Sequence, residues 1–182
     1  MKTLNHVSLF SGIEGFSLGL ALAGIPTNTI LYVEQDQNAI DILRARIKDE
    51  LSLIQDAPIW NDVRSLSGRV LAGKCDIITA GPPCPPFSSN NNGARQGEHD
   101  PRNLFPEVFR LVDEIRPRHL VIENVQAITY ASGSRPEPYA RTIVNTLSEM
   151  GYDSRWGIVE AKHAGANHKR GRWFLLADSN EV

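Results

Sequence analysis

Short apolar runs alternate with stretches of helical periodicity along most of the 182-residue chain. This alternation is typical of βαβ units, in which each strand of a parallel sheet is followed by a crossover helix. It predicts an α/β fold with a doubly wound, mostly parallel sheet. The expected strands are His6–Phe10, Thr29–Val33, a short one ending near Asp62, Asp76–Ala80, His119–Ile122, Tyr152–Val159 and Trp173–Ala177. The expected helices are Phe16–Ala23, Asn38–Glu50, Asn103–Ile115 and Tyr139–Met150.

Composition limits the kinds of protein that this chain can be. The hydrophobic fraction of 41% and the charged fraction of 22% are ordinary for a globular protein, and the length suits one domain. No apolar run approaches the length of a membrane span. The two cysteines, Cys75 and Cys84, argue against a disulfide framework and favour a reducing cytosol. A net charge of −2 gives no bulk attraction for nucleic acid, so such binding would depend on a local patch or another chain.

Prolines surround Cys84 directly after the apolar strand that ends at Ala80. Proline fixes φ and pushes the preceding residue toward extended geometry, so segment 81–88 is predicted to be a stiff loop. Ligands of open α/β sheets bind beyond the carboxyl ends of the strands, where this loop lies. Cys84 is therefore a candidate nucleophile, with a structural cysteine beside a turn as the alternative. The polar segment 88–101 has a length that is usually functional, and we expect it to be a mobile loop.

A glycine-containing turn, 10–15, links the first expected strand to the first helix. It places flexible backbone and a helix N-terminus at the end of a strand, which can hold a carboxylate or phosphate. An ordinary βα turn is the alternative. Glu34 ends the second strand, where an acidic residue can accept hydrogen bonds from ribose hydroxyls. Because the G-x-G-x-x-G pattern of dinucleotide sites is absent, a single nucleoside with an amino-acid tail, S-adenosylmethionine, suits this turn better.

Two further polar groups are expected at the same edge of the sheet. Glu123 directly follows an apolar strand, so its carboxylate is expected at the same edge as Cys84. Partial burial there would raise its pKa and make it a proton donor, with helix capping as the alternative. A basic cluster between the last two strands could grip a phosphate or orient the carboxylate. The cluster comprises His163, Asn167, His168, Lys169, Arg170 and Arg172.

Together these motifs resemble the DNA (cytosine-5) methyltransferase family, in the same order and over nearly the whole chain. The most specific matches are Pro83-Cys84, Glu123-Asn124-Val125 and the Arg-x-Arg of Arg170 and Arg172. The resemblance implies a Rossmann-like methyltransferase fold with an antiparallel C-terminal hairpin strand. It also implies S-adenosylmethionine as cofactor and S-adenosylhomocysteine as product. The cofactor-binding residues that it implies are Phe10, Ser11, Gly12, Ile13, Gly15, Glu34, Gln35, Asp62, Val63, Gly81, Pro82 and Leu104.

The resemblance also implies a covalent route. The Cys84 thiolate would attack C6 of a cytosine flipped out of DNA, after which C5 can accept a methyl group. Glu123 would protonate N3, Asn124 would hold the Pro-Cys loop, and Arg170 would contact the base or orient Glu123. The implied catalytic residues are Pro83, Cys84, Glu123, Asn124, Arg170 and Arg172. No residue is an obvious base for removing the C5 proton, a task that water can perform.

The sequence departs from the family pattern at four positions. Glu14 stands where glycine is usual and would either favour the helix dipole or repel the methionine carboxylate of the cofactor. Pro85 and His168 each replace a usual glutamine, and Gln35 stands where an aromatic residue often stacks on adenine. The family's target-recognition region and last motifs, which complete the cofactor pocket, are not found in these 182 residues.

The expected protein is a single catalytic domain over residues 1–182, cytoplasmic, bacterial or phage-encoded, without membrane or metal. Three alternatives stay open: the catalytic subunit of a split enzyme with a separate target-recognition subunit, an inactive cofactor-binding remnant, and an RNA cytosine-5 methyltransferase. Outside the family, a cysteine-dependent hydrolase would need a histidine base. Neither His99 nor His119 has a spacing or context that supports a dyad with Cys84.

Overall fold

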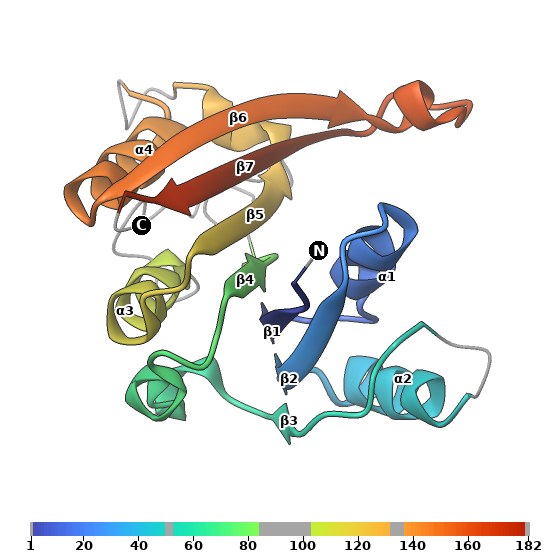
Figure 1. The fold of residues 1–182 in the computed structure, drawn as a ribbon. Coiled ribbons are helices and arrows are strands. Elements are labelled where there is room, and N and C mark those ends of the chain that lie inside the picture. The colour runs from blue at the N-terminus through green and yellow to red at the C-terminus, as the bar shows by residue number, and fades with distance from the viewer. Residues whose placement is uncertain (1, 50–52, 84–102, 132–136, 181–182) are drawn as a thin grey trace.

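The computed structural model describes residues 2–49, 53–83, 103–131 and 137–180. These residues form a seven-stranded sheet in the order β3-β2-β1-β4-β5-β7-β6 (Figure 1). The neighbouring strands β3, β2, β1, β4 and β5 run parallel to one another. Strand β7 is antiparallel to both β5 and β6. The strands are β1 (Leu4–Leu9), β2 (Thr27–Val33), β3 (Ile59–Trp60), β4 (Ile77–Ala80), β5 (His119–Val125), β6 (Tyr152–Glu160) and β7 (Gly171–Ser179). The predicted α/β architecture with an antiparallel C-terminal hairpin is confirmed.

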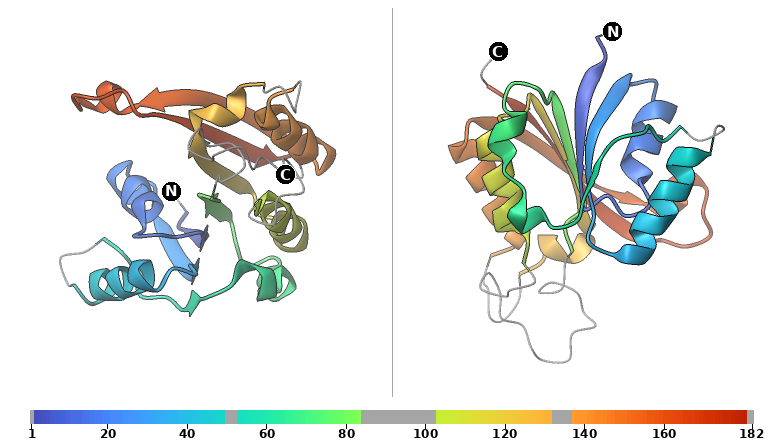
Figure 2. Two further views of the ribbon diagram at one scale, coloured as in Figure 1. Left: turned by 180° about the vertical axis from the view of Figure 1, so that it is seen from behind. Right: turned by 90° about the horizontal axis from the view of Figure 1, so that it is seen from below.

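Helices cover both faces of the sheet, α1 and α2 on one side and α3 and α4 on the other (Figure 2). The helices are α1 (Gly15–Leu22), α2 (Gln37–Lys48), α3 (Phe105–Ile115) and α4 (Tyr139–Glu149), with short 3-10 helices η1 (Val63–Ser65), η2 (Gly68–Leu71), η4 (Gln126–Thr129) and η5 (Ala161–Ala164). Asp36 caps α2 by accepting the Ala39 N–H, and Pro106 occupies the first turn of α3. Within the described ranges, no helix is long and apolar enough to cross a membrane.

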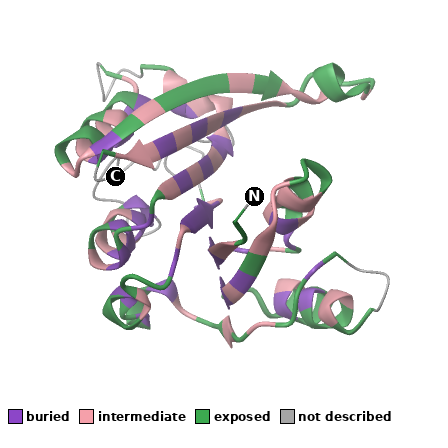
Figure 3. Cartoon of the chain, in the orientation of Figure 1, coloured by how far each residue is buried: buried purple, intermediate pink, exposed green. Residues whose placement is uncertain are grey.

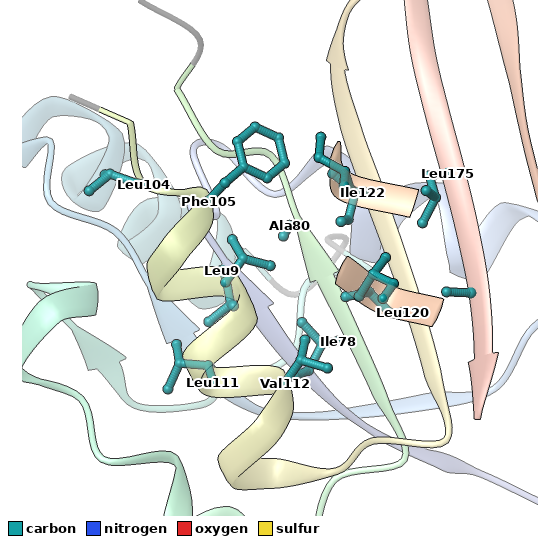
Figure 4. Close-up of a cluster of buried hydrophobic side chains, with 14 of the residues drawn as sticks. Leu9, Ile78, Ala80, Leu104, Phe105, Leu111, Val112, Leu120, Ile122 and Leu175 are labelled. Carbon is teal, nitrogen blue, oxygen red and sulfur yellow. The ribbon is translucent and has the colours of Figure 1, made fainter. Parts of the chain in front are cut away.

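The main core lies between the sheet and α3 (Figure 4). Helix α3 buries residues at helical spacing on one face, as an amphipathic helix does. The strands contribute every second residue, because side chains alternate between the two faces of a sheet. The core residues seen together in Figure 4 include Leu9, Ile78, Ala80, Leu104, Phe105, Leu111, Val112, Leu120, Ile122 and Leu175.

The opposite face of the same strands buries polar groups. The His6 ring lies between two hydroxyls, 3.0 Å from Thr29 Oγ1 and 2.8 Å from Thr79 Oγ1. Thr29 Oγ1 is in turn 3.5 Å from the hydroxyl of Ser17 on α1. Burial lowers the pKa of His6 to about 4, so this imidazole is neutral at physiological pH. A buried polar layer therefore joins β4, β1, β2 and α1.

Burial follows position in the sheet (Figure 3). Every residue of central β4 is buried, whereas the edge strand β6 is largely exposed. Most elements begin or end one to three residues from their predicted bounds, and two of the differences have a clear structural cause. The first strand ends at Leu9, because Phe10 has a positive φ of 56° that leaves extended geometry. The short strand predicted to end near Asp62 is the two-residue β3, which ends at Trp60 because Asp62 caps η1.

Candidate active site

A cavity of about 510 Å³ opens at the carboxyl ends of the parallel strands, within the size range of small-molecule and cofactor pockets. Its walls come from four separate segments that follow β1, β2, β3 and β4, together with the start of α3. The lining residues are Phe10, Val33, Glu34, Gln35, Asp36, Val63, Gly81, Pro83 and Leu104. The topology thus brings the ends of several βα units to one place, as open α/β sheets do.

Glu34 is fixed by backbone donors at the end of β2. Its Oε2 accepts the Gly12 N–H at 2.7 Å, and its Oε1 accepts the N–H groups of Gln35 and Asp36 at 2.8 Å each. Such charge-assisted bonds hold a carboxylate in one orientation. The 10–15 turn and the acidic end of β2 are therefore one unit, in which the backbone of the turn positions the carboxylate that lines the cavity.

The turn itself is held by Ser11, whose side chain is buried. Ser11 Oγ lies 3.0 Å from the Ser8 carbonyl oxygen and 3.2 Å from the Val33 N–H nitrogen, joining β1 to β2. Phe10 and Gly12 both have positive φ, 56° and 55°. Glycine adopts this conformation without strain, which explains its place at the centre of the turn.

Glu14 turns into the protein instead of toward the cavity. Its side chain is fully buried, and its Oε1 accepts the Ser17 N–H at 3.0 Å and the Ser17 hydroxyl at 2.9 Å, capping α1. Its Oε2 is buried with no hydrogen-bond partner among the described residues. Burial raises the pKa of Glu14, against the lowering effect of the Ser8 and Ser17 groups and the Arg46 charge. Of the two roles that the sequence left open, this geometry is that of a helix cap.

Val63 and Leu104 supply apolar walls on the other side of the cavity. Val63 begins η1, which Asp62 caps by accepting the Arg64 N–H at 2.9 Å. The Asp62 carbonyl oxygen also accepts the Trp60 indole N–H at 3.0 Å. Asp62 is thus held next to the wall, while its carboxylate is partly exposed.

Glu123 and Arg172 form an ion pair across β5 and β7, with Glu123 Oε1 2.7 Å from Arg172 Nε. Burial raises the pKa of the Glu123 carboxyl, and the charges of Arg172 and Arg170 offset only part of that rise. A Cβ at Gly81 would lie 3.8 Å from Glu123 Oε2 and 3.9 Å from the Phe10 carbonyl oxygen. These are ordinary van der Waals distances, and they show that the carboxylate and the 10–15 turn both lie next to Gly81, at the start of the Pro-Cys loop.

Asn124 is buried and donates from Nδ2 to the Pro82 carbonyl oxygen at 3.0 Å. This bond ties β5 to the residues directly before Pro83. The nucleophile assigned from sequence, Cys84, lies outside the described residues, as do Pro85, His99 and segment 88–101. Cys75 is a buried free thiol whose pKa is raised to about 12 by burial, so it is inert at physiological pH.

The basic cluster is divided by the structure. Arg172 faces Glu123, and Arg170, with a positive φ of 22°, lies at the entry to β7. His163 is instead engaged with its own turn, where it and Glu160 form a capping box at η5. Lys162 also pairs with Glu160. Within the described part of the chain, no group of three or more candidate metal ligands occurs.

The residues assigned to the cofactor from sequence fall into two groups. Those that line the cavity are Phe10, Glu34, Gln35, Val63, Gly81 and Leu104. Those that lie outside its lining are Ser11, Gly12, Ile13, Gly15, Asp62 and Pro82. Val33 and Asp36 line the cavity but were missed. Val33 directly precedes Glu34 and Asp36 follows it by two residues, so their position at the end of a predicted strand was a usable signal.

Comparison with known proteins shows which proteins the chain is similar to. The family model described as C-5 cytosine-specific DNA methylase matches residues 4–182. The type II methyltransferase M.NaeI of Lentzea aerocolonigenes is 33% identical over 100% of this chain and 41% of its own length. The type II methyltransferase M.AquIA of Picosynechococcus is 30% identical, over 94% of this chain and 71% of its own.

Solved structures agree on the fold. The S. pombe Dnmt2 methyltransferase superposes with a TM-score of 0.74 at 24% identity, covering 98% of this chain and 52% of that one. At this identity the likeness shows the fold alone. The chain spans between 41% and 52% of the length of M.NaeI, M.CviJI, M.NgoMIV and M1.HphI.

Proposed function

Because the chain belongs to the C-5 cytosine-specific DNA methylase family, we propose that it transfers a methyl group from S-adenosylmethionine to C5 of cytosine in DNA. The observation that carries the proposal is the position of Gly81. Glu123 approaches it from β5, and the Phe10 carbonyl of the 10–15 turn approaches it from β1. A proton donor and a nucleoside-sized cavity are therefore adjacent at the start of the Pro-Cys loop.

The residues of the cavity fit S-adenosylmethionine. Glu34 has a carboxylate that backbone N–H groups hold in place, suited to accepting hydrogen bonds from ribose hydroxyls. Val63 and Leu104 offer apolar surface for a purine ring. When bound, the cofactor supplies an electrophilic methyl group on a sulfonium. The amino-acid end of the cofactor would lie toward the 10–15 turn, where the buried Glu14 carboxyl does not compete for the same space.

Glu123 is proposed as the proton donor to N3 of cytosine. Its raised pKa keeps a larger share of the carboxyl protonated near neutral pH than an exposed glutamate would have. Arg172 holds the carboxyl in one orientation through the 2.7 Å contact. Arg170, two residues before Arg172 in the chain, contributes positive charge that stabilises the carboxylate after the proton has left.

Cys84 is proposed as the nucleophile. Its thiolate adds to C6, the ring electrons move toward N3, and N3 takes the proton from Glu123. C5 then carries the electron density needed to accept the methyl group. Loss of the C5 proton to water, return of the N3 proton to Glu123 and elimination of the thiolate restore the ring and free Cys84. Asn124, bonded to the Pro82 carbonyl oxygen, would keep the loop in position during these steps.

A trapping experiment tests nucleophile, base and cofactor together. The protein is incubated with S-adenosylmethionine and DNA carrying 5-fluorocytosine, whose fluorine cannot leave as the C5 proton does. We expect a covalent adduct that peptide mass spectrometry maps to Cys84. Cys75→Ala is the matched control and should still form the adduct, because Cys75 is a buried thiol away from the loop. An adduct with Cys84→Ala, or none with the unaltered protein, would contradict the proposal.

The source of sequence selectivity is a separate proposal. Because the chain spans about half of the first relatives, we expect the target-recognition part of the active enzyme to lie outside these 182 residues, as on a partner subunit. Residues 1–182 alone should bind DNA weakly and without sequence preference. A tight, sequence-selective gel shift from this chain alone would contradict that expectation, and parallel assays on DNA and tRNA separate the two substrates.

A further inference from the structure

A charged cluster on α3, made of Glu107, Arg110 and Glu114, lies beside the cavity wall. Arg110 Nε donates to Glu107 Oε2 at 2.8 Å, and Arg110 Nη1 donates to Glu114 Oε2 at 3.2 Å. All three side chains are at least two-thirds buried. Two carboxylates flanking one guanidinium restrict its rotation, so its remaining N–H donors point in a fixed direction.

Those donors reach the wall segment, defined as residues 62–68. Arg110 Nη2 donates to the Val63 carbonyl oxygen and Nη1 to the Leu66 carbonyl oxygen, both at 2.9 Å. Glu114 Oε2 accepts the Gly68 N–H at 2.6 Å. Three bonds therefore join the cluster to the backbone of the wall segment. Each involves a charged partner, which makes it stronger than a neutral backbone bond.

The wall segment approaches α3 very closely. A Cβ at Gly68 would lie 2.9 Å from both Glu114 Cβ and Ile115 Cγ1, which is shorter than any normal contact. Only glycine fits there, so the backbone sits directly on the helix. Val63 and Leu66 of the wall segment are buried in the main core. The sheet itself supports the segment little, because β3 before it has two residues and η1 within it has three. Its position is thus set by α3 more than by the sheet.

Helix α3 therefore fixes two walls of one cavity. Leu104 at its start lines the cavity directly, and Val63 lines it from the segment that Arg110 holds. We propose that Arg110 is a positioning residue for the adenosyl end of the cofactor, an inference that rests on the proposed function. Arg110 does not line the cavity itself, and it acts by setting where the Val63 wall stands.

The first test needs no cofactor. Hydrogen–deuterium exchange of wall-segment peptides is compared among the unaltered protein, Arg110→Met, Arg110→Lys and Arg141→Met. Arg141→Met is a matched control, because it removes an exposed ion pair between Arg141 on α4 and Glu137, four residues earlier and just before the helix. We expect faster exchange in 62–68 for Arg110→Met and, to a lesser degree, for Arg110→Lys, which keeps the charge but cannot donate to both carbonyls. Unchanged exchange would overturn the inference.

The second test measures binding by calorimetry well below the unfolding temperature. For Arg110→Met we expect affinity for S-adenosylmethionine and for adenosine to fall by the same factor, about tenfold or about 1.4 kcal/mol. Arg141→Met should bind as the unaltered protein does. Full adenosine affinity in Arg110→Met, with 62–68 loosened, would reduce Arg110 to a stabilising residue and overturn its positioning role. If the unaltered protein does not bind the cofactor, the proposed function is overturned, and with it the role of Arg110 in cofactor binding. The exchange experiment would still decide whether Arg110 holds the wall segment.

Discussion

On the α3 side of the sheet, Leu9, Ile78 and Leu120 are fully buried among apolar neighbours. On the α1 side, the same strands bury His6, Ser8 and Thr79. The apolar side gains free energy from burial without directional demands. The polar side gains little net stability, but its hydrogen bonds tolerate only one arrangement of strands and turn. The side that is more demanding in geometry is the one that carries the 10–15 turn.

The candidate catalytic carboxylate belongs to the polar side as well. Glu123 alternates with Ile122 along β5, so it points away from the α3 core. Arg172 and Phe174 on β7 have the same parity, and Phe174 pairs directly with Glu123. One side of the sheet thus supports the fold, and the other holds the groups whose orientation the proposed chemistry needs.

The largest expected effect is on the polar side. Glu123→Gln should lower kcat by about 10²- to 10⁴-fold, because the amide cannot deliver a proton to N3. For the unaltered protein, the rate should fall as pH rises through the raised pKa of Glu123, since the protonated form is the donor. That limb of the pH profile should vanish in the variant. Methyl transfer at saturating substrates measures both, with Glu137→Gln, at an exposed residue just before α4, as the control. Full activity in Glu123→Gln would refute the assignment.

On the apolar side, Leu120→Ala should cost stability and leave the site intact. The side chain is fully buried, and removal of such a leucine costs about 2–5 kcal/mol of unfolding free energy. Urea unfolding measures the loss. Leu22→Ala, at a side chain that is 74% exposed, should change stability by no more than about 0.5 kcal/mol. If Leu120→Ala lost cofactor affinity at temperatures where it is folded, the proposed division of roles, with stability on the apolar side and the site on the polar side, would be wrong.

Glu14 gives a smaller, pH-dependent effect. The pKa of Glu14 is higher in the folded protein than in the unfolded chain. The protonated carboxyl therefore contributes its full stabilisation below the unfolded pKa, and this stabilisation is lost as the pH rises through the folded pKa. Glu14→Gln keeps the cap to Ser17 and should flatten this decline. Ser17→Ala removes a hydroxyl that lowers the pKa of Glu14 and should shift the decline to higher pH. The unfolding temperature measured across a range of pH tests this. If its slope against pH were identical in all three proteins, Glu14 would not take up a proton on folding.

The smallest expected effect concerns His6, whose protonation state should not change between neutral pH and pH 5. His6 has a pKa lowered to about 4 by burial, so its ring should stay neutral at pH 5. Nitrogen NMR of the imidazole, assigned with a His6→Gln variant, measures the protonation state. Stability linked to His6 should be intact above the unfolded pKa and fall as the pH drops toward 4. A protonated ring at pH 5 in the folded protein would show that the polar layer is open to solvent.

Local pattern was enough to predict most elements and the edge where the site lies. Spacing of apolar residues by two marked the strands, and helical spacing marked the helices. The residues that follow each parallel strand were expected at the same edge of the sheet. The carboxylates of Glu34 and Glu123 were found in this way, whereas the role of Asn124 came from the family resemblance. Arg110 was not, because Glu107, Arg110 and Glu114 at helical spacing resemble any solvated surface pairs. Nothing local indicates that their partners are the carbonyls of Val63 and Leu66.

The amino-acid sequence by itself determined the order of strands and helices, the family, and which motifs follow which strand, because these depend on neighbours in the chain. The tertiary structure alone decided that Glu14 turns inward as a cap, that Arg172 meets Glu123, and that α3 carries the wall segment. These contacts depend on burial and on the register between distant strands. The chain specifies both only when the whole sheet has formed.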